Sequence, residues 1–241
     1  AEDIVVSADN TSKLAAKAWS INKEGKVGVG ASVATIVSEN QYAAYLGTGS
    51  TILSSNSLVI AARNHKIDGA VPFKFTDFAS LNLQALLGEN NYYTEVIAGA
   101  GGANVAVAGA FAINVFDDQT LAYIGDDSTI ESGVIELSAD NATTAKAFTG
   151  GVSAAGKVGV GIASSDIVNR SSTQSLIKNN VTVRAADIKV GASALQELGA
   201  FGASASGAGK AGVAGVANVV LSENAVVAAI GDNVDLESDG N

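Results

Sequence analysis

The chain has 241 residues, of which 47% are apolar but only 5% aromatic, and it contains 27 glycines and one proline. Acidic residues outnumber basic residues by 24 to 14, and the resulting net charge of −10 disfavours nucleic acid as a partner. Cysteine is absent, which excludes a disulfide framework and any metal site built from thiolates.

The first expected strand is the stretch Ile4–Asn10, which opens the first of several internal repeats. Similar stretches begin at Leu58, Val134 and Ile188, and a fifth begins at Val234. Repeat arrays need polar caps at their ends, and neither end of this chain resembles one. We therefore expect the polypeptide to be part of something longer.

A second and longer stretch follows in each unit and carries most of the internal similarity. It reads GKVGVGASVATIVSENQYAAYLG from Gly25, and its counterparts begin at Ala103, Gly156 and Gly209. The second residues of the four stretches are Lys26, Asn104, Lys157 and Lys210, and the intervals between them are 78, 53 and 53 residues. The unit with the longer interval therefore carries an insertion of 78 − 53 = 25 residues. Repetition at such a period is typical of stacked repeat proteins.

Apolar residues alternate within the stretch that begins at Gly25, as a β-strand requires. One face consists of branched or small apolar residues: Val27, Val29, Ala31, Val33 and Val37. The other face is smaller: Gly28, Gly30, Ser32, Ala34 and Ile36. Because neither face carries a charge, we expect the strand to be buried on both sides, with the small face admitting another layer at short range.

The insertion falls at about residues 66–93 and holds the only proline of the chain. A short helix from Thr76 or Asp77 to Leu87 would fit its pattern. Insertions in repeat proteins often bind partners, although this one could instead cover the side of the stack. The candidate partner-binding residues are the aromatic residues concentrated here: Phe73, Phe75, Phe78, Tyr92 and Tyr93.

Two pairs of acidic residues come next along the chain and are weak candidates for a calcium site, because calcium prefers oxygen ligands. They are Asp117 with Asp118 and Asp126 with Asp127. The glycine-rich nonapeptide of calcium-binding β-rolls is absent, so acids of solvated turns are the favoured alternative. No other metal site and no cofactor is expected.

Catalytic residues are not expected either. His65 is the only histidine, and no serine and acid are spaced from it in a way that indicates a catalytic triad. The sequence therefore predicts a protein that is not an enzyme.

Turn signals rich in Gly, Asn and Asp separate the expected strands and predict an all-β chain. The preferred fold is a repetitive parallel β-helix, or β-solenoid, with one inserted loop or short helix. The alternative is an antiparallel β-sandwich of long strands. In either case we expect one array of about four units, at residues 1–56, 57–132, 133–185 and 186–241. The uncharged run Val96–Phe116 alternates like a strand, so no membrane span is expected.

The order of these motifs, VxVxA, then an alanine-rich strand, then GKVGVGA, then NxxxAYIG, resembles the repeats of giant secreted bacterial proteins. These are proteins of the filamentous-haemagglutinin and fusobacterial-leukotoxin type. Residues 25–47, 103–125, 156–178 and 209–231 carry the resemblance. It implies an extracellular or cell-surface β-solenoid that serves as a stalk or adhesive rod and has no catalytic residues in this region.

Three functions remain open at this point. The first is a structural and adhesive module whose rigid rod presents a binding surface to host cells or neighbouring cells, with an unidentified host or matrix glycan or protein as partner. The second is a segment of a secreted cytolytic toxin. The third is a filament subunit that associates end to end by strand addition near Ile4 and Val234.

Overall fold

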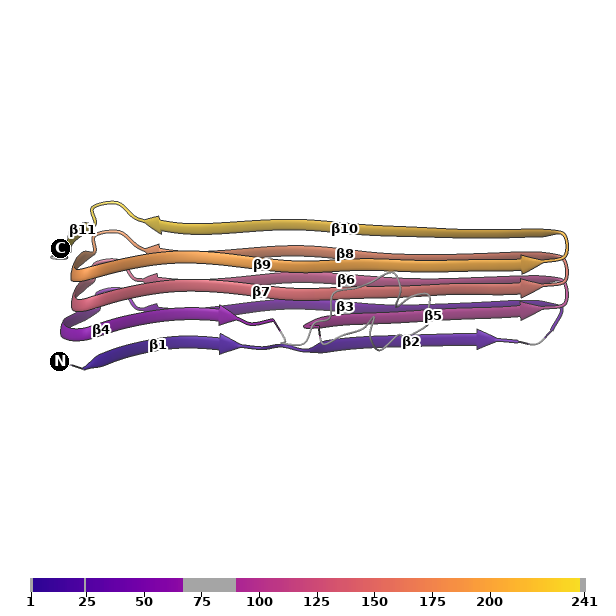
Figure 1. Ribbon diagram of the computed structural model, residues 1–241, viewed down its shortest axis with the longest axis horizontal. Coiled ribbons are helices and arrows are strands. Elements are labelled where there is room, and N and C mark those ends of the chain that lie inside the picture. The colour runs from indigo at the N-terminus through magenta and orange to yellow at the C-terminus, as the bar shows by residue number, and fades with distance from the viewer. Residues whose placement is uncertain (1, 24, 67–89, 239–241) are drawn as a thin grey trace.

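The computed structural model describes residues 2–23, 25–66 and 90–238, and all regular elements among them are β-strands (Figure 1). They form two sheets, through which the chain passes in turn. The first sheet consists of β1 (Asp3–Asn10), β2 (Leu14–Asn22), β4 (Thr51–Asn64), β5 (Tyr92–Gly102), β7 (Thr129–Ala155), β9 (Thr182–Ala208) and β11 (Asp235–Ser238). The second sheet consists of β3 (Val27–Leu46), β6 (Val105–Ile124), β8 (Val158–Ile177) and β10 (Ala211–Ile230).

Every strand pairing within the described residues is parallel. Val27 of β3 pairs with Val105 of β6, which pairs with Val158 of β8. The positions that the repeats make equivalent are thus the positions that pair. The alternative prediction of an antiparallel sandwich is wrong for this part of the chain, because its strands do not pair as hairpins. The all-β architecture with parallel sheets is consistent with a β-helix or solenoid.

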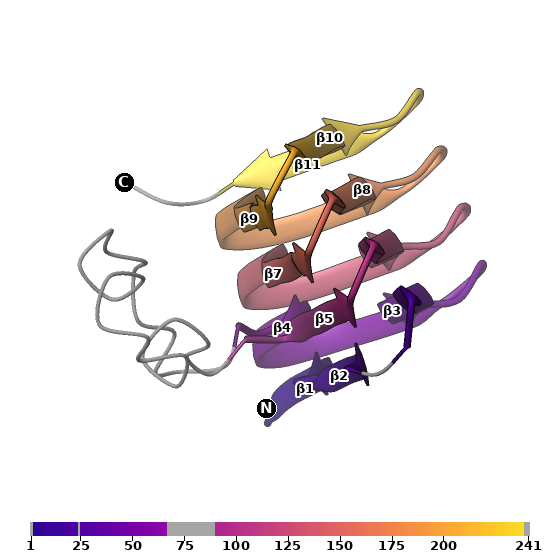
Figure 2. The same cartoon turned by 90° about the vertical axis from the view of Figure 1, so that its right-hand side faces the viewer.

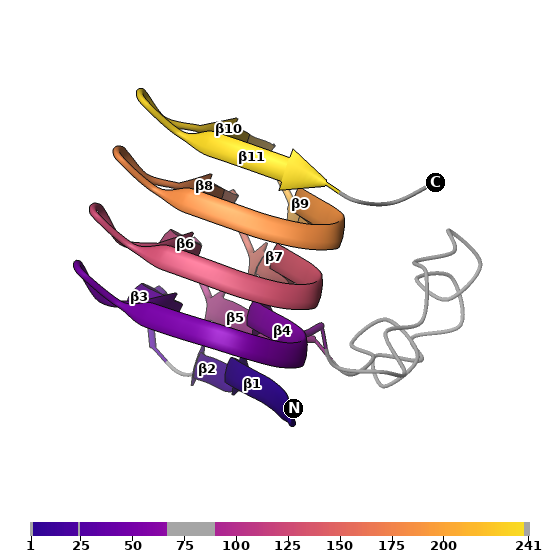
Figure 3. The same cartoon turned by 90° about the vertical axis from the view of Figure 1, so that its left-hand side faces the viewer.

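The two sheets face each other in successive layers, as the end-on views show (Figures 2 and 3). At one end, connections of two residues lead from β5, β7 and β9 to the next strand of the second sheet. These connections also stack: the Lys157 backbone amide donates to the Asn104 carbonyl, and the Lys210 backbone amide donates to the Lys157 carbonyl. A strand of 27 residues, such as β7, is about 90 Å long, whereas adjacent layers are only about 5 Å apart. The described residues therefore form a flat blade that is longest along its strands.

The turns at the opposite end of the blade repeat one unusual backbone conformation. Gly49, Asp127, Asn180 and Asn233 occupy equivalent turn positions with φ angles of 73°, 58°, 55° and 54°. This left-handed region is open to glycine and is tolerated best by Asn and Asp among other residues. The choice of Gly, Asp and Asn at this position is thus explained by the turn itself.

The strand register accounts for all 25 residues of the insertion. Asn64 of β4 pairs with Asn141, 77 residues later, whereas Tyr92 of β5 pairs with Ala145, 53 residues later. Thus 24 extra residues lie between Asn64 and Tyr92, and a bulge after Ile52 supplies the remaining one. Residues 67–89, and with them the predicted helix, lie outside the described residues.

Two predicted repeat starts are out of register. Leu58 and Ile188 both pair with Ile135, one residue after the predicted start at Val134. The sequence places a fifth repeat start at Val234, level with Ile188, but β11 begins at Asp235 and pairs with Thr182. The residue level with Ile188 therefore comes several positions after Val234.

The prediction that the strand following Gly25 is buried on both sides is also wrong. In β3 buried and exposed residues alternate strictly from Val27 to Ile36. The small face points inward, and the valine face points outward, with Val29 at 57% and Val37 at 70% exposure. The backbones of the two sheets approach so closely here that only small residues fit between them: a Cβ at Gly30 would lie 2.2 Å from the Gly99 carbonyl oxygen.

Two apolar clusters fill the interior, and a band of polar side chains separates them. One cluster includes Ile36, Val96 and Ile167, and the other includes Ile60, Ile124 and Leu137. We call the band between them the polar belt. It consists of Asn10, Asn64, Asn141 and Thr143 of the first sheet and Asn40, Asp118, Thr120, Asn169, Ser171 and Thr173 of the second.

Stacked asparagine amides form one side of the polar belt. Asn10 Nδ2 donates to Asn64 Oδ1 over 3.2 Å, and Asn64 Nδ2 donates to Asn141 Oδ1 over 2.9 Å. These amides follow the stacking direction of the strands, since the three residues are paired neighbours in β1, β4 and β7. They link successive layers in addition to the backbone hydrogen bonds.

Candidate interaction surface

The predicted aromatic binding residues are either outside the described residues or buried. Phe73, Phe75 and Phe78 fall in the first group. Tyr92 is 2% exposed; its ring stacks on Phe116 with the centroids 4.1 Å apart, and burial raises the pKa of its phenol to about 12. Tyr93, on the other face of β5, is 8% exposed and donates a hydrogen bond to Glu95. Neither tyrosine ring is available at the surface.

The four acidic calcium candidates do not converge. Asp117 and Asp118 are consecutive residues of β6 and therefore point to opposite faces of the second sheet. Asp126 accepts a hydrogen bond from the Asn179 amide and Asp127 accepts one from the Asn180 side chain, so both link stacked turns. In the part of the chain that the structure describes, no group of three His, Cys, Asp or Glu residues could hold a metal ion.

Asp118 is the only one of these four acids that is fully buried. Its Oδ1 accepts a hydrogen bond of 2.7 Å from Asn40 Nδ2. Burial raises the pKa of its carboxyl group, and the nearby charge of Asp117 raises it further, while the Asn40 bond opposes the shift. The buried phenols of Tyr42 and Tyr92 are its other titratable neighbours.

An Asp118→Asn variant should therefore change how stability depends on pH. With its pKa raised in the folded state, Asp118 contributes full stability below about pH 3.8 and loses that contribution as the pH rises through its folded-state pKa. Denaturant unfolding should give similar free energies for variant and parent near pH 3 and a higher one for the variant at pH 7. A parent that gains on the variant between pH 3 and 7 would contradict this.

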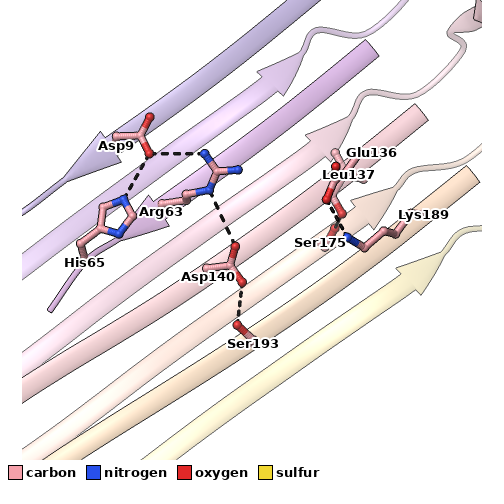
Figure 4. Close-up of polar contacts among 9 residues, drawn as sticks. All are labelled: Asp9, Arg63, His65, Glu136, Leu137, Asp140, Ser175, Lys189 and Ser193. Atoms are coloured by element: carbon pink, nitrogen blue, oxygen red, sulfur yellow. Dashed lines mark hydrogen bonds and ion pairs between the residues drawn. The ribbon is translucent and has the colours of Figure 1, made fainter. Parts of the chain in front are cut away.

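The outer surface of the first sheet carries rows of exposed ion pairs (Figure 4). Arg63 lies between Asp9 and Asp140, with N–O distances of 3.7 and 3.9 Å, and His65 lies 3.4 Å from Asp9. Further along, Lys189 pairs with Glu136 over 2.7 Å. Exposed pairs of this kind contribute little stability. They place opposite charges of neighbouring strands next to each other. His65 is an exposed residue of this surface.

The outer surface of the second sheet is apolar over half of its length. We define the valine face as the outward residues at every second position of 27–37, 105–115, 158–168 and 211–221. One row consists of four paired valines, at positions 29, 107, 160 and 213. Asp166 is the only charged residue at these positions. The apolar alternation is visible in the sequence, but the expectation that this face lies in the interior is wrong.

The valine face is large for a surface that meets only water. Ten residues along the strand and four strands across give roughly 33 Å by 19 Å, or about 600 Å². This area is at the upper end of the range found for the largest apolar patch on a monomeric protein, and such patches often take part in interactions. The valine face is therefore the candidate functional site.

Comparisons of the chain with protein-family models, with curated proteins and with solved structures gave no match. Within the described residues, the structure has no helix of the length and apolar character that crossing a membrane requires.

Proposed function

We propose that this chain is a structural and adhesive module of a large extracellular or bacterial cell-surface protein, built as a two-sided β-solenoid. Its stacked strands would supply a stiff scaffold, and its valine face would bind the valine face of a second copy. The observation that carries the proposal is this apolar surface on a regular parallel sheet, in which Asp166 is the single charged residue. Copies carried on neighbouring cells, or on one cell, could associate in this way.

The size and shape of the valine face favour a second copy as its occupant. Two faces of about 600 Å² bury roughly 1,200 Å² when they meet, which is the lower end of the range for specific complexes. Sheets pack face to face about 10 Å apart through interdigitating aliphatic side chains, and rows of valine suit this packing. An anionic membrane surface is disfavoured, because the chain carries a net charge of −10.

Paired charges introduced into the centre of the valine face test the proposal. Val107 and Val160 are directly paired neighbours, so in a Val107→Lys/Val160→Glu variant the two charges can neutralise each other in the monomer. In a face-to-face dimer they would be buried, which costs several kcal/mol. We expect the parent to form a concentration-dependent dimer in sedimentation equilibrium, and this variant to remain monomeric with an affinity at least about a hundredfold lower.

A matched control uses the outer surface of the first sheet. Ala142 and Leu195 are also paired neighbours, and Leu195 is half exposed. An Ala142→Lys/Leu195→Glu variant should dimerise like the parent. A parent that sediments as a monomer up to the highest soluble concentration would refute self-association, and so would equal loss of dimer in both variants.

A further inference from the structure

The polar belt contains buried polar atoms without a protein partner. Among the described residues, these are Asp118 Oδ2, Thr120 Oγ1, Asn141 Nδ2, both amide atoms of Asn169, and Thr173 Oγ1. The residues that carry them are at most 2% exposed. Unpaired polar atoms are costly in a protein interior, and six together would cost about as much as the whole stability of a small domain.

These atoms lie close together in the stack. Thr120 and Thr173 are directly paired across β6 and β8, and Asp118 is two residues from Thr120 on the same inner face. Asn169 pairs with Phe116, which is two residues before Asp118. The second sheet thus brings four of the five side chains onto neighbouring positions of two strands.

Asn141 faces this group from the first sheet. The Leu137 carbonyl accepts a hydrogen bond of 3.1 Å from Ser175, and Thr149 lies 2.9 Å from Ser165. These two contacts hold the segment 137–149 of β7 opposite the segment 165–175 of β8. Asn141 lies within the first segment, and Asn169 and Thr173 lie within the second.

We propose that the polar belt binds a row of buried water molecules that runs along the stacking direction and satisfies these side chains. Adjacent strands are about 4.8 Å apart, so one water molecule can reach the stacked hydroxyls of Thr120 and Thr173 at ordinary hydrogen-bond distances. A buried water molecule usually makes about three hydrogen bonds. Six unpaired atoms therefore need at least about two such molecules.

Replacing a hydroxyl by a methyl group of the same shape distinguishes a hydrated belt from a dry one. In a hydrated belt, Thr120→Val and Thr173→Val each remove a hydrogen bond to bound water, and we expect the folding equilibrium constant to fall about tenfold per substitution. In a dry belt, the same substitutions remove an unpaired polar atom and raise the denaturant midpoint. A raised midpoint in both variants would overturn the proposal.

Thr149→Val and Thr51→Val are the controls. Thr149 is buried and its hydroxyl has a protein partner, Ser165, so its loss should also lower the denaturant midpoint. Thr51 is an exposed residue of β4, in the first sheet and outside the valine face, where the same change should have little effect. Together they calibrate the sign and size of the effect at the belt.

A direct observation makes the proposal testable even if the valine variants fail to fold. A crystal structure of the parent chain at about 1.5 Å resolution should show ordered solvent density within hydrogen-bond distance of the Thr120 and Thr173 hydroxyls. No density at these positions would overturn the proposal. If the stability of the parent depends on which monovalent cation is present, and that of Asp118→Asn does not, the belt binds a metal ion instead of water. That result would also overturn the proposal.

Discussion

Gly30→Ala is expected to lower the free energy of unfolding by about 3 kcal/mol or more. The added Cβ would lie 2.2 Å from the carbonyl oxygen of Gly99 and 2.9 Å from its carbonyl carbon. Both are backbone atoms of the facing sheet, so no side-chain rotation can relieve the contact, and the two sheets must move apart. Denaturant unfolding followed by circular dichroism measures the loss.

Gly191→Ala is the matched control for this prediction. Gly191 also lies within a long strand, but a Cβ there would meet no atom within 4 Å. Its substitution should change the stability by less than about 0.5 kcal/mol. Equal midpoints for the two alanine variants would show that the sheets are not held at the short separation described here. Gly159→Val and Gly161→Val should also destabilise the fold, because a Cβ at Gly159 would lie 2.6 Å from the Ser206 hydroxyl and one at Gly161 would lie 2.7 Å from the Ala205 carbonyl oxygen.

Lys17→Met is expected to have the second largest effect, about 2 to 3 kcal/mol of lost stability. Glu95 is 2% exposed, and its carboxylate is held by Lys17 Nζ at 3.2 Å and by the Tyr93 hydroxyl at 3.0 Å. Removing the lysine leaves a buried carboxylate without its counter-charge, which typically costs 3–5 kcal/mol when both partners are buried. The expected value is smaller because the Lys17 side chain is about half exposed.

Two further variants isolate the role of burial in this ion pair. Lys189→Met removes the partner of Glu136 in an exposed pair and should have little effect on stability. Adding Glu95→Gln to Lys17→Met removes the uncompensated charge and should recover most of the stability. If Lys17→Met and Lys189→Met cost the same, Glu95 is solvated in solution and the prediction is wrong.

The repeats in the sequence predicted most of the strand arrangement. The spacings of 78, 53 and 53 residues correspond directly to strand pairings, because parallel in-register strands place equivalent repeat positions side by side. Strand character followed from the alternation of residues such as Val27 and Gly28, and the turns followed from residues such as Asn180 that accept a left-handed backbone. These are local properties, and the sequence alone determined them.

The sequence could not decide which face of each strand lies inside, because both faces are apolar or small. The tertiary structure placed the valines outside and the glycines inside, since the facing backbones come too close for a larger side chain at Gly28 or Gly30. Because side chains alternate between faces along β6, the same choice of inner face placed Asp118 inside, near Thr120, Asn169 and Thr173. The distance between the two sheets is a property of the whole stack, and it determined both the exposed valine face and the buried polar belt.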